Sequence, residues 1–327
     1  MTLIERPRRL RSTSVLRAMV RDTSVAPASL ILPVFIREGL TTPKPIEGMP
    51  GVVQHTKDSY KAEIDLALEA GIGGVMVFGI PEKRDPSGTE ALNPEGVLSS
   101  AIREARTRAG DDLVIVADLC LDEFTSHGHC GVLDKRGNVE NDATLKIYGE
   151  MAKVLAASGA HMVGTSGMMD GQVGVVRDAL DSDGYTDVLI LAYAAKFASA
   201  FYGPFRDAVE SQLQGNRNTY QQDPGNIKES MREVRLDVSQ GADIVMVKPS
   251  LAYLDILYAA SQAVDVPTAS YIVSGEMAMI EAAAAQGSLD RERAILEVLS
   301  SVKRAGASVI CTYWAIEAAH MLKRNLA

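Results

Sequence analysis

The stretch Ala242-Asp-Ile-Val-Met-Val-Lys248-Pro249 decides the fold. Its apolar run, Ile244 to Val247, has strand length and is rich in β-branched residues, as is typical of a central strand in an α/β sheet covered on both faces. The run ends in a lysine, although a buried strand tip is a costly place for an ammonium group. If Lys248 lines a dry pocket, desolvation lowers the pKa of its amine and makes it a nucleophile. A lone lysine in this position could instead snorkel to the surface.

A second lysine follows another apolar run. Val188-Leu-Ile-Leu-Ala-Tyr193 reads as a strand, and Lys196 comes three residues after it. Two lysines at the tips of consecutive parallel strands would point into one site. A primary amine attacks a ketone or aldehyde to give an iminium, and a neighbouring ammonium lowers the pKa of the attacking amine. The pair therefore predicts Schiff-base chemistry, with Lys248 and Lys196 as catalytic residues.

Strand-like and helical patterns alternate eight times along the chain, without a block of polar linker. The strand-like runs are 30–36, 74–78, 113–117, 161–164, 188–193, 243–247, 269–273 and 309–313. The helical patterns are 58–70, 94–109, 142–158, 171–182, 225–239, 251–263, 275–302 (read as two helices) and 314–324. Eight βα units predict an α/β protein with a closed (β/α)₈ TIM barrel. A doubly wound open sheet is the alternative fold, but no glycine-rich phosphate fingerprint follows the first strand.

The first 25 residues differ from the rest of the chain. They carry six arginines and few apolar residues; the arginines are Arg6, Arg8, Arg9, Arg11, Arg17 and Arg21. An arm that grips a neighbouring subunit, a nucleic-acid arm and a solvated tail all fit this composition. Because the whole chain has a net charge of −9, contact with another copy is electrostatically reasonable. We expect an extended N-terminal arm over residues 1–25 that contacts another subunit, and a single catalytic barrel over residues 26–327.

Composition also limits the partners. The acidic balance argues against a general nucleic-acid binder. No apolar run approaches the roughly 20 residues of a transmembrane helix, and the N-terminus has no apolar core of a secretory signal. Three cysteines in 327 residues do not make a disulfide framework. We therefore expect a cytoplasmic protein that binds neither membranes nor nucleic acid.

The segment after the third predicted strand has the residues of a metal site. Cys120 and Asp122 are two apart, and Cys130 follows eight residues later. Thiolates suit zinc, and a carboxylate is a tolerable third ligand. Zinc with an open coordination position would polarise a carbonyl or hold a hydroxide. The alternative is a core loop with two reduced cysteines.

The segment after Lys196 is too long for an idle connector. It contains Phe201-Tyr-Gly-Pro-Phe-Arg206-Asp and Gly215-Asn-Arg217-Asn-Thr-Tyr220-Gln221. Glycine, proline and aromatic residues suit a lid that closes over a site and excludes water. Arg206 and Arg217 would clamp a carboxylate through paired hydrogen bonds. In the alternative reading, both arginines are surface charges paired with Asp207 and Asp223.

Five motifs occur together in this chain: Cys120-Leu-Asp122-Glu-Phe-Thr-Ser-His-Gly-His-Cys130-Gly, Met168-Met-Asp-Gly, Ala195-Lys196-Phe-Ala-Ser-Ala-Phe-Tyr-Gly-Pro-Phe-Arg206, Met246-Val-Lys248-Pro and Val273-Ser274-Gly-Glu276. Together they resemble the porphobilinogen synthase family, also called 5-aminolevulinate dehydratase. They occur in the family's order, and the resemblance runs from about Arg6 to the C-terminal helix. It implies condensation of two 5-aminolevulinate molecules to porphobilinogen in haem biosynthesis. It also implies a TIM barrel, an arm that wraps a neighbour, and a homo-octamer.

The resemblance also assigns roles to single residues. Lys248 matches the Schiff-base lysine of one substrate, the A side, and Lys196 that of the other, the P side. Asp118 matches an acid that moves protons. The remaining matches bind substrate or an allosteric magnesium: Arg206, Arg217 and Gln221 for the A-side carboxylate, Ser274 and Tyr313 for the P-side carboxylate, Tyr271 in the same substrate-binding set, and Glu233 for magnesium.

Three positions depart from the family's usual pattern. Asp122 stands where the zinc-dependent pattern has the middle of three cysteines, whereas the magnesium-dependent pattern has aspartates in place of the cysteines. We expect zinc at Cys120, Asp122 and Cys130, and the mixed ligand set leaves the identity of this metal open. Gly167 replaces an aspartate, and Gln172 stands where arginine is frequent. Both lysines and both lid arginines remain, which favours a subfamily variation over loss of activity.

Two other functions fit the same residues less completely. A Schiff-base aldolase on the same barrel would need only one lysine, and the second would serve to lower its pKa. A catalytically silent metal-binding or assembly protein would be expected to lose a lysine or a lid arginine, and neither is lost.

Overall fold

The computed structural model describes residues 4–326; residues 1–3 of the expected arm and residue 327 of the expected barrel lie outside the described residues. Eight parallel strands form a closed barrel, because the last strand pairs with the first. In order around the barrel they are β1 (Leu30–Arg37), β4 (Gly74–Ile80), β5 (Val114–Leu119), β6 (Met162–Thr165), β7 (Leu189–Lys196), β8 (Ile244–Lys248), β9 (Thr268–Tyr271) and β10 (Val309–Cys311). The predicted TIM barrel is confirmed, and the doubly wound sheet is excluded.

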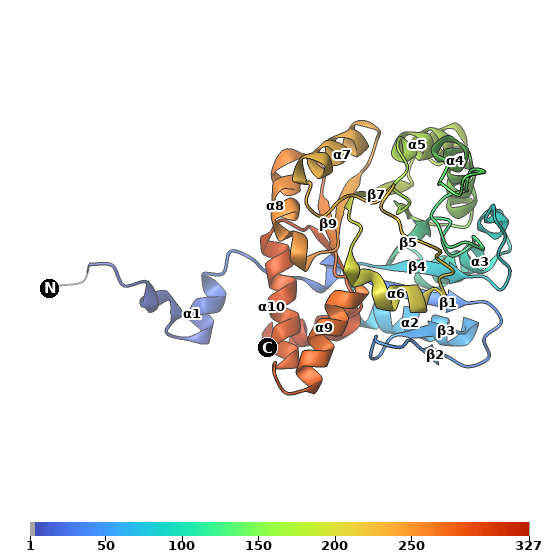
Figure 1. The fold of residues 1–327 in the computed structure, drawn as a ribbon. Helices are drawn as coiled ribbons and strands as arrows, with labels where there is room; N and C mark the ends of the chain where they lie inside the picture. Colours follow the sequence, from blue (N-terminus) through green and yellow to red (C-terminus); the bar gives the residue numbers. More distant parts are fainter. Residues whose placement is uncertain (1–3, 327) are drawn as a thin grey trace.

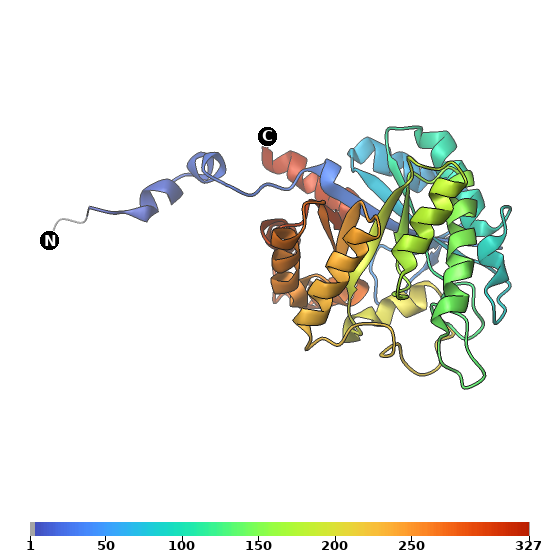
Figure 2. The same ribbon diagram turned by 90° about the horizontal axis from the view of Figure 1, so that it is seen from above.

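Helices surround the barrel (Figures 1 and 2). They are α2 (Lys57–Ala70), α3 (Val97–Ala109), α4 (Asn141–Ala157), α5 (Gln172–Ser182), α7 (Ile227–Ser239), α8 (Leu254–Ala263), α9 (Ser274–Ala285), α10 (Arg291–Arg304) and α11 (Ala315–Leu326). The pattern over 275–302 is two helices, as predicted. Short 3₁₀ turns lie at η3 (Thr89–Leu92) and η5 (Leu251–Tyr253). Within the described part of the chain, every helix falls short of the length and apolar character that a membrane span needs.

The strands read as continuous apolar runs because both of their faces are covered. Strand β4 is buried at every position, and β1 is buried at all positions except its last. Each fully buried valine, leucine or isoleucine contributes about 1.5–3 kcal/mol relative to an exposed side chain. The barrel interior is thus a packed core, and the chemistry is left to the carboxyl-terminal rim.

Strand β7 contains a β-bulge that sets the register of the two lysines. Ala192 pairs with Val245, but the next pairs are Ala195 with Val247 and Lys196 with Lys248. Between these pairs, β7 therefore advances by three residues while β8 advances by two. Bulges commonly redirect a side chain next to an active site. Here the bulge places Lys196 directly beside Lys248 at the end of the neighbouring strand.

The sequence pattern did not reveal two additions to the barrel. Strand β3 (Val53–His55) pairs with the end of β1, and β2 (Lys44–Pro45) pairs antiparallel with β3. The lid segment after β7 contains a 3₁₀ turn, η4 (Ala200–Tyr202), and a short helix, α6 (Gly203–Ala208). This helix lies across the rim of the barrel (Figure 1).

The N-terminal segment projects away from the barrel (Figures 1 and 2). It contains η1 (Pro7–Arg11) and α1 (Ser14–Met19), neither of which has a buried residue. The chain joins the barrel at η2 (Pro27–Ser29), which contacts α11. Val15 and Met19 are each 73% exposed, so α1 presents apolar side chains that this chain does not cover.

Candidate active site

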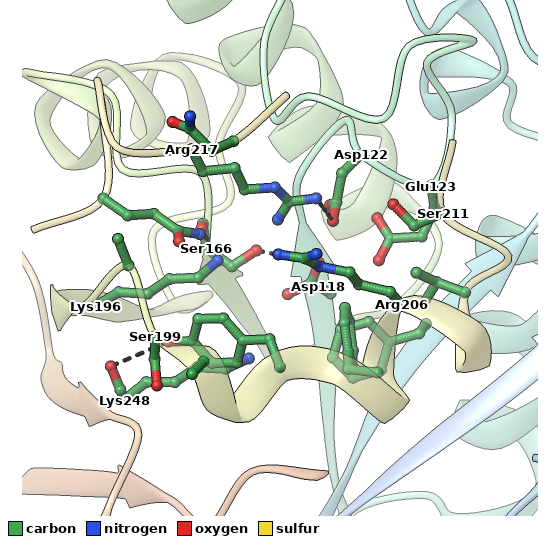
Figure 3. Close-up of a pocket in the computed structure, with 18 of the residues that line it drawn as sticks. Asp118, Asp122, Glu123, Ser166, Lys196, Ser199, Arg206, Ser211, Arg217 and Lys248 are labelled. Atoms are coloured by element: carbon green, nitrogen blue, oxygen red, sulfur yellow. Dashed lines mark hydrogen bonds and ion pairs between the residues drawn. The ribbon is translucent and has the colours of Figure 1, made fainter. Parts of the chain in front are cut away.

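A cavity of about 230 Å³ opens at the carboxyl-terminal rim, under the lid segment (Figure 3). Seven predicted site residues line it: Asp118, Asp122, Lys196, Arg206, Arg217, Gln221 and Lys248. They come from the ends of β5, β7 and β8 and from the lid. The structure therefore brings both lysines, two carboxylates and both lid arginines to one pocket.

Lys248 lies in an aromatic, water-poor part of this cavity. Only 5% of the residue is exposed, and its Nζ lies 4.0 Å from the centre of the Tyr271 ring. The rings of Tyr193, Phe205 and Tyr202 are 5.2, 5.2 and 5.7 Å away. Burial, followed by the like charge of Lys196, lowers the pKa of Lys248 to about 7, although the ring faces also attract an ammonium. A substantial fraction of this amine is consequently unprotonated and nucleophilic near neutral pH.

Lys196 is equally buried and differently held. Its Nζ donates a hydrogen bond of 2.6 Å to the carbonyl oxygen of Ser166 and lies 5.6 Å from the centre of the Tyr193 ring. Tyr193 and Lys196 are three residues apart, yet both side chains face the barrel interior, which requires the bulge between them. The two amines therefore approach the same cavity from neighbouring strands.

Asp118 lies between the lysines and the predicted metal ligands. Its Oδ2 accepts a hydrogen bond of 3.2 Å from the Ser166 hydroxyl, and its buried Oδ1 has no partner. Burial and then the charge of Asp122 raise the pKa of Asp118 to about 7, against the opposing effect of both lysines. A carboxyl group with this pKa can both give and take a proton near neutral pH.

The lid contributes two buried donors that lack partners. Arg217 Nη2 donates to Asp122 Oδ2 at 2.8 Å and to the Gly128 carbonyl at 2.9 Å, while its Nε is buried without a partner. Gln221 Nε2 is also buried and unpartnered. Arg206 is exposed and forms no ion pair with any described residue. Unsatisfied buried donors are rare, and a ligand carboxylate would satisfy these.

The alternative pairings of the two lid arginines do not form: Arg217 makes no ion pair with Asp223, and Arg206 makes none with Asp207. The partner of Arg217 is Asp122, from the loop after β5. The alternative of two surface charges paired with Asp207 and Asp223 therefore does not describe Arg217, which pairs with Asp122 instead. Arg217 is a buried residue of the site, and Arg206 lies at the mouth of the cavity.

The three predicted metal ligands form one buried cluster. The Sγ atoms of Cys120 and Cys130 and a carboxylate oxygen of Asp122 all lie within 4.8 Å of one another. Burial raises the pKa of the Cys130 thiol, but the hydrogen bond with Cys120 and the Arg217 guanidinium outweigh burial and lower it. Two thiols and one carboxylate at this spacing fit a borderline-soft ion such as zinc. A second possible ligand group, three carboxylates and one thiol, shares two residues with this cluster; its members are Asp118, Cys120, Asp122 and Glu123.

Tyr148 explains the unusual residue at position 167. A Cβ added to Gly167 would lie 1.8 Å from the Tyr148 hydroxyl, which has taken the space that a side chain needs. That hydroxyl donates to the carbonyl oxygen of Cys130 and lies 3.9 Å from Cys120 Sγ. The absence of a side chain at Gly167 is therefore matched by the Tyr148 hydroxyl, which fills the same space. The glycine does not indicate that the metal cluster has been lost.

Gln172, the other departure from the family pattern, is a structural residue. Its Nε2 donates to the Thr165 carbonyl at 2.9 Å, and its Oε1 accepts from the Met169 amide at 3.1 Å. These two bonds brace the loop after β6. The side chain does not line the cavity that holds the lysines.

Six predicted residues lie outside the lining of this cavity: Cys120 and Cys130 of the metal cluster, and Tyr271, Tyr313, Ser274 and Glu233. The ring of Tyr271 covers Lys248, and its hydroxyl is 3.1 Å from that of Tyr313. The Ser274 hydroxyl accepts a hydrogen bond of 3.0 Å from the Phe205 amide of the lid. Glu233 is half-buried on α7, where burial and then Asp170 raise its pKa. Neither potential metal cluster of the described residues includes Glu233.

Sequence reasoning missed several residues of the site. Tyr148 lies on α4, where an aromatic residue reads as ordinary core, and Tyr193 lies within a strand. Glu123 is 2% exposed, lines the cavity and leaves Oε1 without a partner. Its position directly after Asp122 was the only signal available.

The family model described as delta-aminolevulinic acid dehydratase matches residues 4–321. The chain belongs to this family. A relative of that name from Streptomyces coelicolor is 60% identical over 320 residues, which cover 97% of both chains. One from Mycobacterium tuberculosis is 56% identical with the same coverage. As a member of the family, the protein is an enzyme of the dehydratase class.

Solved structures agree with this assignment. The delta-aminolevulinic acid dehydratase (porphobilinogen synthase) of Toxoplasma gondii, determined in complex with the reaction product porphobilinogen, is similar with a TM-score of 0.94 at 42% identity. The match covers 97% of this chain and 91% of that chain. An aldolase named QR15 has a TM-score of 0.51 at 13% identity and shares only the barrel fold.

Proposed function

We propose that this protein is a porphobilinogen synthase, which condenses two molecules of 5-aminolevulinate to porphobilinogen with release of two waters. One observation carries the proposal: Lys196 and Lys248 are register partners that line a single buried cavity. Unpartnered lid donors in the same cavity support it, since each 5-aminolevulinate molecule carries a ketone and a carboxylate. An aldolase would need only one such lysine.

The lysines would act as nucleophiles. Free Lys248 attacks the ketone carbon of one substrate, and the resulting carbinolamine loses water to give an imine; Lys196 does the same with the other substrate. Asp118, with a pKa raised to about 7, would give and accept the protons of these steps. One lysine is displaced when the amino group of the second substrate forms the new C–N bond. The other leaves by elimination after the new C–C bond has formed, so two waters balance the reaction.

The lid residues would orient the substrate of Lys248. Arg206, Arg217 and Gln221 line the cavity, and two of them carry unsatisfied buried donors. A carboxylate held by paired hydrogen bonds fixes the position of the ketone relative to the amine. Ser274 and Tyr313 remain proposed contacts of the second substrate, and Tyr271 remains a proposed substrate contact.

Cys120, Asp122 and Cys130 would hold the catalytic metal, which we propose to be zinc because two of the three donors are thiols. Zinc held by these residues would supply a Lewis acid able to polarise a substrate oxygen. A second ion, magnesium, is proposed at Glu233. Burial is the main cause of the raised pKa of Glu233, and the charges of Asp170 and Glu229 raise it further; a cation would relieve this repulsion.

The same proposal extends to assembly and location. The exposed apolar side chains of α1 and the arginines of residues 4–25 would pack on another copy of this acidic chain, as an arm separate from the barrel. We propose a homo-octamer in the cytoplasm. Purified protein incubated with 5-aminolevulinate tests the central claim: we expect a pyrrole detectable by a colorimetric reagent, and its absence with metal supplied would refute the function.

A further inference from the structure

Asp122 contacts the lid as well as the predicted metal cluster. Its Oδ2 accepts the 2.8 Å hydrogen bond from Arg217 Nη2, and the two side chains are only 5% and 13% exposed. The partners lie 95 residues apart in sequence, one in the loop after β5 and one in the lid. Figure 3 shows the guanidinium reaching across the cavity to this carboxylate.

The lid backbone also packs directly against the loop that carries Asp122. A Cβ on Gly128 would lie 2.4 Å from the Leu213 amide nitrogen, so only glycine permits this approach. The Gly128 carbonyl accepts the second bond of Arg217 Nη2. The ion pair thus adds to a close packing contact between the lid and the barrel. It leaves Nε of the same guanidinium without a partner and so available to a ligand.

We propose that Asp122 is a positioning residue for Arg217: its carboxylate anchors the lid to the barrel and orients the guanidinium toward the substrate carboxylate. The second half of this statement rests on the proposed function, and the first half does not. A cysteine at position 122 would offer zinc a third thiolate, but it would be a poor acceptor for a charge-assisted bond from arginine. The aspartate therefore serves the lid independently of the metal.

The experiment uses the full-length protein: zinc binding is measured on the untreated protein, and the lid is then followed after treatment with a chelator, so that metal binding does not contribute. Hydrogen exchange of the amides in residues 211–221 reports lid closure without ligand. Calorimetry with levulinate, a keto acid without the amino group, reports how well the carboxylate is held. For Asp122→Asn we expect faster exchange of the lid amides and a levulinate Kd at least about tenfold higher.

Cys120→Ser is the matched control, since Cys120 belongs to the metal cluster but forms no bond with Arg217. We expect it to lose zinc while lid exchange and levulinate affinity stay within about twofold of the wild type. Asp122→Cys should separate the role in metal binding from the role in anchoring the lid. We expect this variant to bind zinc at least as tightly as the wild type, and its lid amides to exchange as fast as those of Asp122→Asn. Arg217→Gln should reproduce the loosened lid from the other side of the pair.

Two results would overturn the inference. Asp122→Asn and Arg217→Gln could both keep wild-type lid exchange and levulinate affinity, which would leave Asp122 as a metal ligand alone. Alternatively, Cys120→Ser could loosen the lid as much as Asp122→Asn, which would assign the effect to the whole loop. If wild-type protein makes no pyrrole, the proposed function fails, but the exchange measurement still decides whether Asp122 anchors the lid.

Discussion

Lys196 and Lys248 are register partners on neighbouring parallel strands, and their nitrogens lie 5.6 and 5.2 Å from the centre of the same Tyr193 ring. Two ammonium groups so placed repel each other, and burial weakens the hydration of both. Burial, followed by the like charge of Lys196, lowers the pKa of Lys248 to about 7. The unprotonated amine that the reaction needs therefore follows from burial and, in second place, from the strand register that sets Lys196 beside Lys248.

Lys248→Met should abolish turnover and leave the fold intact. Methionine fills a similar volume and removes a buried amine, so we expect little loss of stability and a fall in kcat of at least about a thousandfold. Pyrrole formation and circular dichroism of the same preparation measure the two effects. Substantial residual turnover in a folded variant would contradict the assigned nucleophile.

The rate at which borohydride reduces and traps the imine on Lys248 should depend on pH, with a midpoint near 7. The nucleophile is the free amine, so borohydride labelling of Lys248 in the presence of 5-aminolevulinate should speed up as pH rises through about 7, and then level off. Lys196→Met removes the like charge that helps to lower this pKa. The profile of the variant should therefore shift to higher pH, as followed by peptide mapping of the adduct. A profile that does not move would mean that Lys196 exerts no charge effect on Lys248.

Removal of the metal should lower activity, and loss of one thiol should prevent its return. Cys130→Ser keeps the size of the side chain but removes a thiolate of the cluster, so we expect a zinc affinity lower by about tenfold or more. Elemental analysis after dialysis measures the bound zinc, and Cys311→Ser, which lies outside both potential metal clusters of the described residues, is the control. Full activity in chelated wild-type protein would remove the cluster from the catalytic site.

Gly167→Ala should destabilise the protein even though the change is small. The new Cβ would overlap the Tyr148 hydroxyl, and such overpacking costs about 1–3 kcal/mol. Gly203→Ala is a matched control, because nothing lies within 4 Å of its added Cβ. Urea unfolding of both variants gives the comparison. Equal stability of the two would show that Tyr148 moves aside at no cost.

Deletion of residues 1–20 should reduce the size of the assembly. The deleted segment includes Val15 and Met19, whose apolar side chains this chain leaves uncovered. Sedimentation velocity of the truncated and complete proteins measures the outcome. An unchanged sedimentation profile would show that the segment makes no contribution to the assembly.

The barrel could be predicted from the sequence because each strand is a buried apolar run, and each run alternates with a helix-period pattern. The rim chemistry followed, since residues after each strand share one end of the barrel. The antiparallel pair β2 and β3 could not be predicted, because strands of two and three residues are too short to show an alternation of apolar and polar residues. The partner of Arg217 and the fit of Tyr148 against Gly167 are tertiary contacts that join distant segments, and local pattern does not encode them.

The extra residue in β7 has a consequence for how a shift along this strand could damage the enzyme. Side chains alternate between the two faces of a regular strand, so Tyr193 and Lys196, three residues apart, would lie on opposite faces if β7 had no bulge. A slip of β7 by one residue against β8 would therefore turn the terminal amine away from the cavity. Such a protein would retain every reactive group in its composition and still lack a working pair.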